Sequence, residues 1–141
     1  MKKSELVSKI TEISRKAKGL AFAEKYAASI EEYKKGIELI GEKIMESKYA
    51  VMLYSGIGEA YYLQKKWEEA LEYYGHAVMS EGGLGEPLIH LRLGQLRYEL
   101  GQKEKAKDEL MRAYMGGGEI YFEHENPKYF ALISGIISNQ N

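Results

Sequence analysis

Hydrophobic positions in this chain recur with the spacing of an α-helix. Near the N-terminus Leu6, Ile10 and Ile13 follow one another at intervals of three or four residues, and the same spacing continues to the C-terminus. Intervals of three and four place side chains on one face of a helix, whereas a half-buried strand requires strict alternation. The pattern therefore predicts an all-α protein built from amphipathic helices.

Two glycine-centred segments, residues 54–61 and 90–97, resemble each other and begin two similar stretches of sequence. Twelve residues after each central glycine there is an alanine, four further on a large residue, and three beyond that another alanine. In the two stretches these positions are Gly58, Ala70, Tyr74 and Ala77, then Gly94, Ala106, Leu110 and Ala113. Small residues at fixed places allow two antiparallel helices to approach closely, and large ones fill the space between turns.

This pattern resembles the tetratricopeptide repeat, in which an aromatic residue, Leu-Gly, Tyr, Ala, Phe and Ala recur over about 34 residues. Residues 51–82 match through Tyr54, Ile57, Gly58, Tyr61, Trp67, Ala70, Tyr74 and Ala77. Residues 87–118 match less fully, and residues 10–41 form a degenerate copy in which Ser29 replaces an alanine. The resemblance implies a single domain, residues 1–141, of antiparallel helix pairs stacked as a short right-handed solenoid of about three repeats.

The connections between the copies are irregular. Gly58 and Gly94 are 36 residues apart, and the extra length falls at residues 81–86, where glycines precede Pro87. Glycine after one helix and proline at the start of the next suit a stop and a restart. Between the first and second copies the spacing is longer, so we expect the second helix to run past Gly41 to about Glu46.

A further helix is expected over residues 127–138. Asn126 and Pro127 are typical of a helix start, and the apolar residues Tyr129, Phe130, Ile133, Ile136 and Ile137 then share one face. A stacked array needs a terminal helix to cover its last apolar face, so we interpret this segment as a C-terminal capping helix. The alternatives are a helix that docks on a partner, or a self-association surface for a homodimer formed by Phe130, Ile133, Ile136 and Ile137.

Composition and charge exclude several classes of protein. There is no cysteine, so disulfides and cysteine-ligated zinc are excluded. A formal net charge of −1 gives no overall attraction to nucleic acid. The longest uncharged run, residues 129–141, is too short to span a membrane. Because the N-terminus has no apolar signal-like stretch, we expect a cytoplasmic protein with no membrane partner.

No arrangement of residues indicates catalysis, a metal site or a cofactor. His76, His90 and His124 are scattered, and His90 occupies an aromatic packing position, which favours a buried, hydrogen-bonded histidine between helices. The histidine in Glu123-His124-Glu125 has no second histidine one turn away. The glycines of 116–118 are not followed by the lysine of a phosphate loop. We therefore expect a protein that is not an enzyme and needs no cofactor or metal.

The resemblance implies that the first helices of the repeats line a concave groove that binds a peptide or a protein. The groove-facing positions lie three residues before the glycine position and one, four and five after it. In this chain the candidate groove residues are Lys18, Ser55, Glu59, Tyr62, Leu91, Gln95 and Tyr98. Tyr62 and Tyr98 occupy equivalent positions, and aromatic residues with a polar tip are favoured interface anchors.

Members of the family that bind chaperone tails hold a C-terminal carboxylate with basic and amide side chains at these positions. Here only Lys18 fits, and Glu59 would repel a carboxylate, so we expect no binding of such tails. The leading hypothesis is a non-catalytic protein-interaction module. The last third of the chain also looks like stand-alone bacterial repeat proteins, some of which serve as antitoxin or immunity binders of a partner toxin. A self-associating structural module is the alternative from another class.

Overall fold

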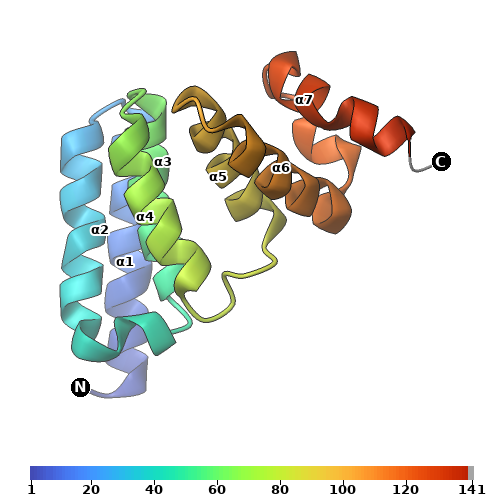
Figure 1. The fold of residues 1–141 in the computed structure, drawn as a ribbon. Coiled ribbons are helices and arrows are strands. Elements are labelled where there is room, and N and C mark those ends of the chain that lie inside the picture. The colour runs from blue at the N-terminus through green and yellow to red at the C-terminus, as the bar shows by residue number, and fades with distance from the viewer. Residues whose placement is uncertain (140–141) are drawn as a thin grey trace.

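The computed structural model describes residues 1–139, and within them the regular structure is entirely helical (Figure 1). The α-helices are α1 (Lys3–Phe22), α2 (Tyr26–Ile40), α3 (Ala50–Leu63), α4 (Trp67–Met79), α5 (Pro87–Glu99), α6 (Lys103–Gly117) and α7 (Pro127–Ser138). Two short 3-10 helices, η1 (Gly41–Glu46) and η2 (Glu119–Phe122), connect α2 to α3 and α6 to α7.

The helices form consecutive antiparallel pairs, α1 with α2, α3 with α4, and α5 with α6. The second helix of each pair also packs against the first helix of the next pair, and α7 follows α6 in the same way. This stacking confirms the all-α solenoid predicted from the sequence. No described helix has the length and apolar character needed to cross a lipid bilayer.

The helices of a pair come close where the sequence places its glycines. A Cβ atom on Gly58 would lie 2.7 Å from the Tyr74 ring, and one on Gly94 would lie 2.6 Å from the Leu110 side chain. Both distances are shorter than carbon atoms tolerate, so a larger residue would push the helices apart. The repeated spacing of glycine and large residue is therefore the packing contact within each pair.

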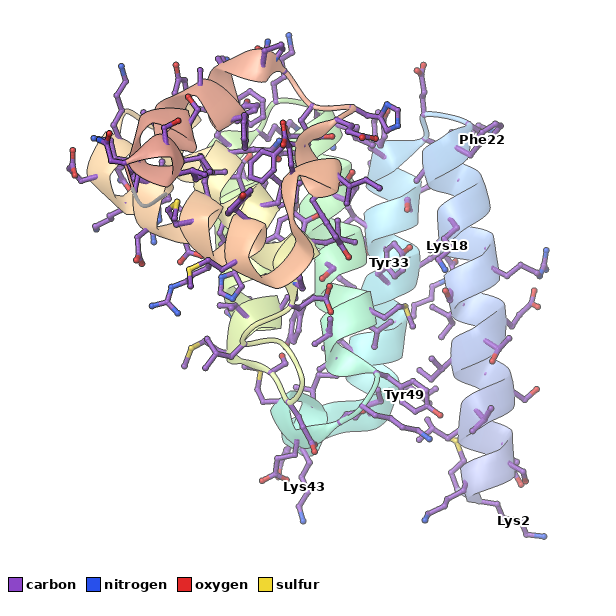
Figure 2. The ribbon with its side chains drawn as sticks, turned by 90° about the vertical axis from the view of Figure 1, so that its right-hand side faces the viewer. Lys2, Lys18, Phe22, Tyr33, Lys43 and Tyr49 are labelled. Atoms are coloured by element: carbon purple, nitrogen blue, oxygen red, sulfur yellow. The ribbon has the colours of Figure 1, made fainter. Side chains whose placement is uncertain are left out.

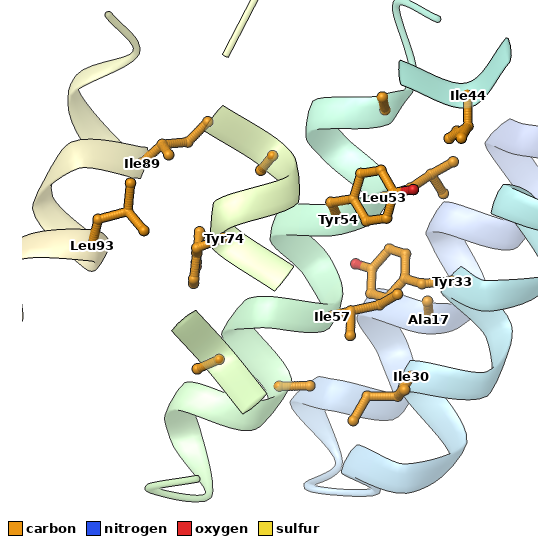
Figure 3. Packing of buried hydrophobic residues seen from close by; sticks show 14 of the residues in the cluster. Ala17, Ile30, Tyr33, Ile44, Leu53, Tyr54, Ile57, Tyr74, Ile89 and Leu93 are labelled. Carbon is orange, nitrogen blue, oxygen red and sulfur yellow. The ribbon is translucent and has the colours of Figure 1, made fainter. Parts of the chain in front are cut away.

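The core runs continuously from the first pair to α5. Figure 3 shows Ala17, Tyr33 and Ile57 close together where the first two pairs meet, with Ile89 and Leu93 of α5 beyond Tyr74. In the degenerate first copy, Ser29 is fully buried and its hydroxyl donates a 2.7 Å hydrogen bond to the carbonyl oxygen of Ala17. The serine thus satisfies its polar group locally and leaves the close helix contact intact.

The link between the first two pairs differs from the expectation of one long helix to about Glu46. The α-helix ends at Ile40, because Gly41 has a φ of +84°, in the left-handed region that suits glycine. The chain then turns through η1 before α3 begins. The expectation of a continuous α-helix is wrong, although the segment remains helical in the 3-10 form.

The C-terminal helix α7 covers the end of the array. Asn126 accepts a hydrogen bond from the backbone N–H of Lys128 at 3.0 Å and so caps its first turn. Ile133 is fully buried against α5 and α6, while Phe130 and Ile137 are half-buried against the same core. Of the residues considered for self-association, Ile133 therefore has no surface left, and only Phe130, Ile136 and Ile137 remain partly exposed.

Candidate functional site

A cavity of about 510 Å³ opens among α1, α3, α5 and the segment that follows α6. The candidate groove residues Lys18, Ser55, Glu59 and Leu91 line this cavity. In Figure 2, Lys18 on α1 and Tyr33 on α2 both point toward the space in front of α3. Four of the seven groove residues proposed from the sequence thus share one hollow.

The walls of the cavity are largely apolar. Val51 and Met52 of α3 face it on one side, and Leu88 and Ile89 of α5 line it on the other. Leu88 is 54% exposed, so the cavity is open to solvent at this end. A volume of this size and an apolar lining with a few polar groups are typical of a ligand-binding cavity.

Gly56 shapes the floor of the cavity. A Cβ atom at this position would lie 2.3 Å from the Tyr33 ring, so only glycine allows the ring to rest on α3. Tyr33 is 4% exposed, and this burial raises the pKa of its hydroxyl. The aromatic ring is therefore held firmly at the boundary between the first two pairs.

Arg92 of α5 organises the polar side of the cavity. Its guanidinium donates two hydrogen bonds to the carboxylate of Glu59, from Nε at 2.8 Å and from Nη2 at 3.1 Å. The Tyr74 hydroxyl donates to the same carboxylate at 2.6 Å. Burial by itself would lower the pKa of Arg92, but the hydrogen bonds and charge of Glu59 outweigh it and raise the pKa. The Glu59 carboxylate thus joins α3 to α4 and α5 through these hydrogen bonds.

The segment after α6 contributes to the same network through Glu125. Its carboxylate accepts hydrogen bonds from Arg92 Nη1 and from Gln95 Nε2, both at 2.6 Å. Burial opposes ionisation of Glu125, but the hydrogen bond from Gln95 and the charge of Arg92 hold its pKa below the ordinary value. The chain thereby fastens its own C-terminal segment to the concave side of α5.

This segment covers most of the groove positions on α5. Gln95 is fully buried, and Leu91 is 2% exposed against a core that includes Phe122 and Tyr129. The ring of Tyr98 meets that of Tyr129 edge to face at 5.4 Å. These positions contact the chain itself, and the open part of the groove lies over α1, α3 and the start of α5.

The two tyrosines proposed as interface anchors have structural contacts. The Tyr62 ring lies 5.5 Å from that of Trp67 and 4.3 Å from the guanidinium carbon of Arg92. Tyr98 lies beside the ammonium of Lys128, which forms a 2.6 Å ion pair with Glu99. Both rings therefore serve the packing of the α3–α5–α7 region, and neither lines the cavity.

Arg92 was not singled out from the sequence, and Glu125 was considered only as part of a metal-binding tripeptide that the sequence did not support. Arg92 lies one position beyond a groove residue in the repeat register, and Glu125 lies outside the three repeats. Their contact joins residues 33 apart and depends on the path of the chain between α6 and α7. No local pattern in the sequence signals it.

His90 is a buried structural residue, as its packing position indicated. Its Nε2 accepts the N–H of Gly85 at 2.9 Å, which leaves Nδ1 to donate to Glu109 at 2.6 Å. The ring thus joins the loop before α5 to α6. Within residues 1–139 the structure contains no group of three histidines, aspartates or glutamates arranged to hold a metal ion.

Comparison with known proteins identifies the architecture. No family model and no curated protein match this sequence. Solved structures do match over nearly the whole chain. The type III secretion chaperone SycD of Yersinia enterocolitica, in complex with a peptide of the translocator YopD, superimposes with a TM-score of 0.70 at 13% identity, covering 93% of this chain and 94% of SycD. The chain has the tetratricopeptide-repeat fold.

Two further structures show the same likeness. The first tetratricopeptide repeat domain of Spaghetti (RPAP3), bound to the HSP90 peptide SRMEEVD, gives a TM-score of 0.67 at 21% identity and covers 94% of both chains. PcrH from Pseudomonas aeruginosa gives 0.69 at 14% identity, covering 97% of this chain and 95% of PcrH. At these identities the likeness establishes the fold of this chain, and its function has to be argued from its own residues.

Proposed function

We propose that this protein is a non-catalytic interaction module that binds a segment of a partner protein in its concave groove. The observation that carries the proposal is the open cavity over α1, α3 and the start of α5, because four of the seven groove residues predicted from the repeat register line it. Two structures of the same fold contain bound peptides, from YopD and from HSP90, which supports a peptide as the kind of ligand.

The binding surface in this proposal is the N-terminal half of the groove. The concave side of α5 is occupied by Glu125 and by α7, whereas Lys18, Met52 and Leu88 border open space. An extended peptide is favoured over a folded surface, because a hollow with apolar walls accepts single side chains. Affinity then depends on the side chains that enter the cavity.

The test is a selection of binding peptides from a random display library, followed by measurement of their affinity for variants. Leu88→Glu places a charge in the wall of the cavity, at a position that is 54% exposed near the start of α5. Leu84→Glu is the matched control, because Leu84 is 75% exposed and lies outside the cavity. We expect Leu88→Glu to weaken the selected peptides at least tenfold and Leu84→Glu to leave them unchanged.

Two results would contradict this proposal. One is a selection that yields no peptide above background. The other is a set of peptides whose binding responds equally to both substitutions, since the ligand would then lie elsewhere. Helical circular dichroism of the two variants verifies that they remain folded.

Chaperone tails are expected to be poor ligands of this groove. The positions that would hold a terminal carboxylate carry Ser55, Glu59, Leu91 and Gln95, and the last two are buried. The heptapeptide SRMEEVD, which is bound to the RPAP3 domain, should therefore show no micromolar binding in calorimetry. Micromolar affinity for this peptide would refute the assignment of these positions.

A further inference from the structure

Three large hydrophobic side chains are largely exposed where α4 and α6 end. Met79, Leu84 and Met115 are each at least 75% exposed, and among the large hydrophobic residues of 1–139 only Phe22 is more exposed. Met79 ends α4, Leu84 lies in the loop that follows, and Met115 lies in the last turn of α6. We name this surface the methionine edge. None of its three residues lines the cavity of the groove.

The three residues of the methionine edge belong to segments that meet at the same end of the second and third helix pairs (Figure 1). Met79 and Met115 are 36 residues apart, the interval between the central glycines of the two repeats, so they occupy equivalent positions on α4 and α6. A Cβ atom on Gly83 would lie 2.9 Å from a backbone Cα of α4, and one on Gly116 would lie 3.0 Å from the Pro87 ring. The loop thus packs on the end of α4, and the end of α6 packs on the start of α5.

The rim of the methionine edge is acidic. Four glutamates lie on the segments that carry or flank it: Glu72, Glu81, Glu86 and Glu119. In the part of the chain that the structure describes, none of their carboxylates forms an ion pair. Arg112, one turn before Met115, is already paired with Asp108, and the lysines of α6 lie in its first half. The exposed apolar side chains are therefore surrounded by unpaired negative charge.

We propose that the methionine edge binds a basic amphipathic helix of a partner protein. Methionine side chains are flexible and polarisable, so they adapt to the shape of an apolar helix face. Contact with such a face removes apolar surface of both partners from water. The lysine or arginine side chains beside the apolar stripe face the glutamates of the rim, where opposite charges attract. Because this surface lies outside the cavity, the inference does not depend on the proposed function.

The dimensions of the methionine edge suit a single helix. α4 and α6 both pack against α5. Packed helices have axes about 8–10 Å apart, which places the two methionines about 10–20 Å from each other. A helix of 14 residues is about 21 Å long, so its apolar stripe reaches both methionines.

The acidic rim disfavours two other occupants. In a symmetric dimer the same surface meets itself, so the glutamates of one copy would face those of the other. A membrane surface that carries anionic lipids would repel the same carboxylates. Charge therefore favours a basic partner over a second copy of the chain or a lipid surface.

The probe for the test is the 14-residue peptide acetyl-(Leu-Lys-Lys-Leu-Leu-Lys-Leu)2-amide with a fluorophore, whose leucines share one helical face. One control peptide has glutamate in place of every lysine. In the other, leucine and lysine alternate, so that the leucines do not share a helical face. We expect the basic helical peptide to bind at least tenfold more tightly than either control in fluorescence anisotropy, and its affinity to fall as salt is raised.

A double variant tests the apolar contact. Met79→Gln combined with Met115→Gln replaces both thioethers by polar side chains of similar length, and it should weaken the basic peptide at least about tenfold. Phe22→Gln is the control, because it removes an even more exposed hydrophobic side chain at the end of α1. We expect it to leave the affinity unchanged. Since all three positions are exposed, helical circular dichroism should be the same for every variant.

A second double variant tests the acidic rim. Glu72→Gln combined with Glu81→Gln should weaken the basic peptide about three- to tenfold at low salt and have little effect at high salt. Glu5→Gln combined with Glu24→Gln is the control, because both glutamates are exposed and the net charge changes by the same amount. An equal loss in the two double variants would show that net charge alone attracts the peptide, and it would overturn the inference.

Other outcomes would also overturn the inference. They are equal binding of the lysine and glutamate peptides, and binding that is unaffected by the loss of both methionines. A dimer in light scattering that the methionine double variant dissociates would assign the edge to a second copy. Binding to phosphatidylserine vesicles that the same variant abolishes would assign it to a lipid surface.

The experiments keep this inference separate from the proposed function. Peptides that bind the groove and respond to Leu88→Glu should retain their affinity in the methionine double variant. A selected peptide that responds to Leu84→Glu alone would bind the methionine edge, since Leu84 lies outside the cavity. Failure of either proposal therefore leaves the other standing.

Discussion

Replacement of Arg92 by methionine tests whether the polar network holds the C-terminal segment on the groove. The change removes two hydrogen bonds to Glu59, one to Gln95 and one to Glu125, while the methionine retains most of the apolar stem. Glu125 would keep only its hydrogen bond from Gln95, and Glu59 only that from Tyr74. Both carboxylates would remain in place without a positive partner.

The magnitude follows from the exposure of these groups. Loss of one partner from a fully buried ion pair costs about 3–5 kcal/mol. The side chains of Arg92 and Glu125 are about one-fifth exposed and that of Glu59 is 36% exposed, so water recovers part of this cost. We therefore expect the free energy of unfolding to fall by about 2–3 kcal/mol, which lowers the melting temperature by about 8–12 °C in a domain of this size.

The assay is urea denaturation followed by helical circular dichroism, together with the fluorescence of the single tryptophan. Trp67 lies on the cleft that Glu125 and Tyr129 also line, so its emission should shift when the C-terminal segment is released. Arg112→Met is the control, because Arg112 pairs with Asp108 on the surface, where such pairs contribute about 0–1 kcal/mol. A loss for Arg92→Met no larger than that for Arg112→Met would refute the reasoning.

Two other predictions concern the helix contacts and the pH dependence of the C-terminal segment. Gly94→Ala should lower the free energy of unfolding by about 1–3 kcal/mol, because the added Cβ would lie 2.6 Å from the Leu110 side chain. Gly75→Ala, whose Cβ would meet nothing within 4 Å, should raise it by about 0.5–1 kcal/mol in thermal melts. Equal effects of the two substitutions would contradict the role of Gly94 as a close contact between α5 and α6. Because the folded-state pKa of Glu125 is lowered, its contribution to stability is present above the unfolded value of about 4.3 and is lost as the pH falls through the folded value. The difference in unfolding free energy between the protein and its Glu125→Gln variant should therefore be large at neutral pH and shrink in acid; a difference independent of pH would rule out the ion pair.

Tyr62 and Tyr98, which were predicted to be interface anchors, make packing contacts within the chain, and they illustrate what the repeat register predicts and what it misses. The register placed both tyrosines on first helices facing the groove, together with Lys18, Ser55 and Glu59, and these last three line one cavity in the structure. It could not predict that Tyr62 packs on Trp67 beneath Arg92, or that Tyr98 meets Tyr129. Replacement of these tyrosines by alanine would remove packing contacts, so it is a poorer test of ligand binding than a change at Lys18 or Leu88.

The sequence by itself determined the helices and the way in which they pair. Glycine and alanine at fixed intervals, facing Tyr74 and Leu110 on the partner helix, specify close antiparallel contacts through local geometry alone. The end of α2 at Gly41 could not be predicted in this way, because a glycine near a helix end can also continue the helix. The fold class was therefore predictable.

Only the tertiary structure decided which part of the groove is open. The chain leaves α6 through Gly118, whose φ is +81°, and the path it takes from there brings Glu125 to Arg92 and Gln95. That contact depends on the angles of a nine-residue connection and on the packing of α7, and neither is encoded in a periodic pattern. The same is true of Tyr33, which lines the cavity only because Gly56 on a separate helix leaves room for its ring.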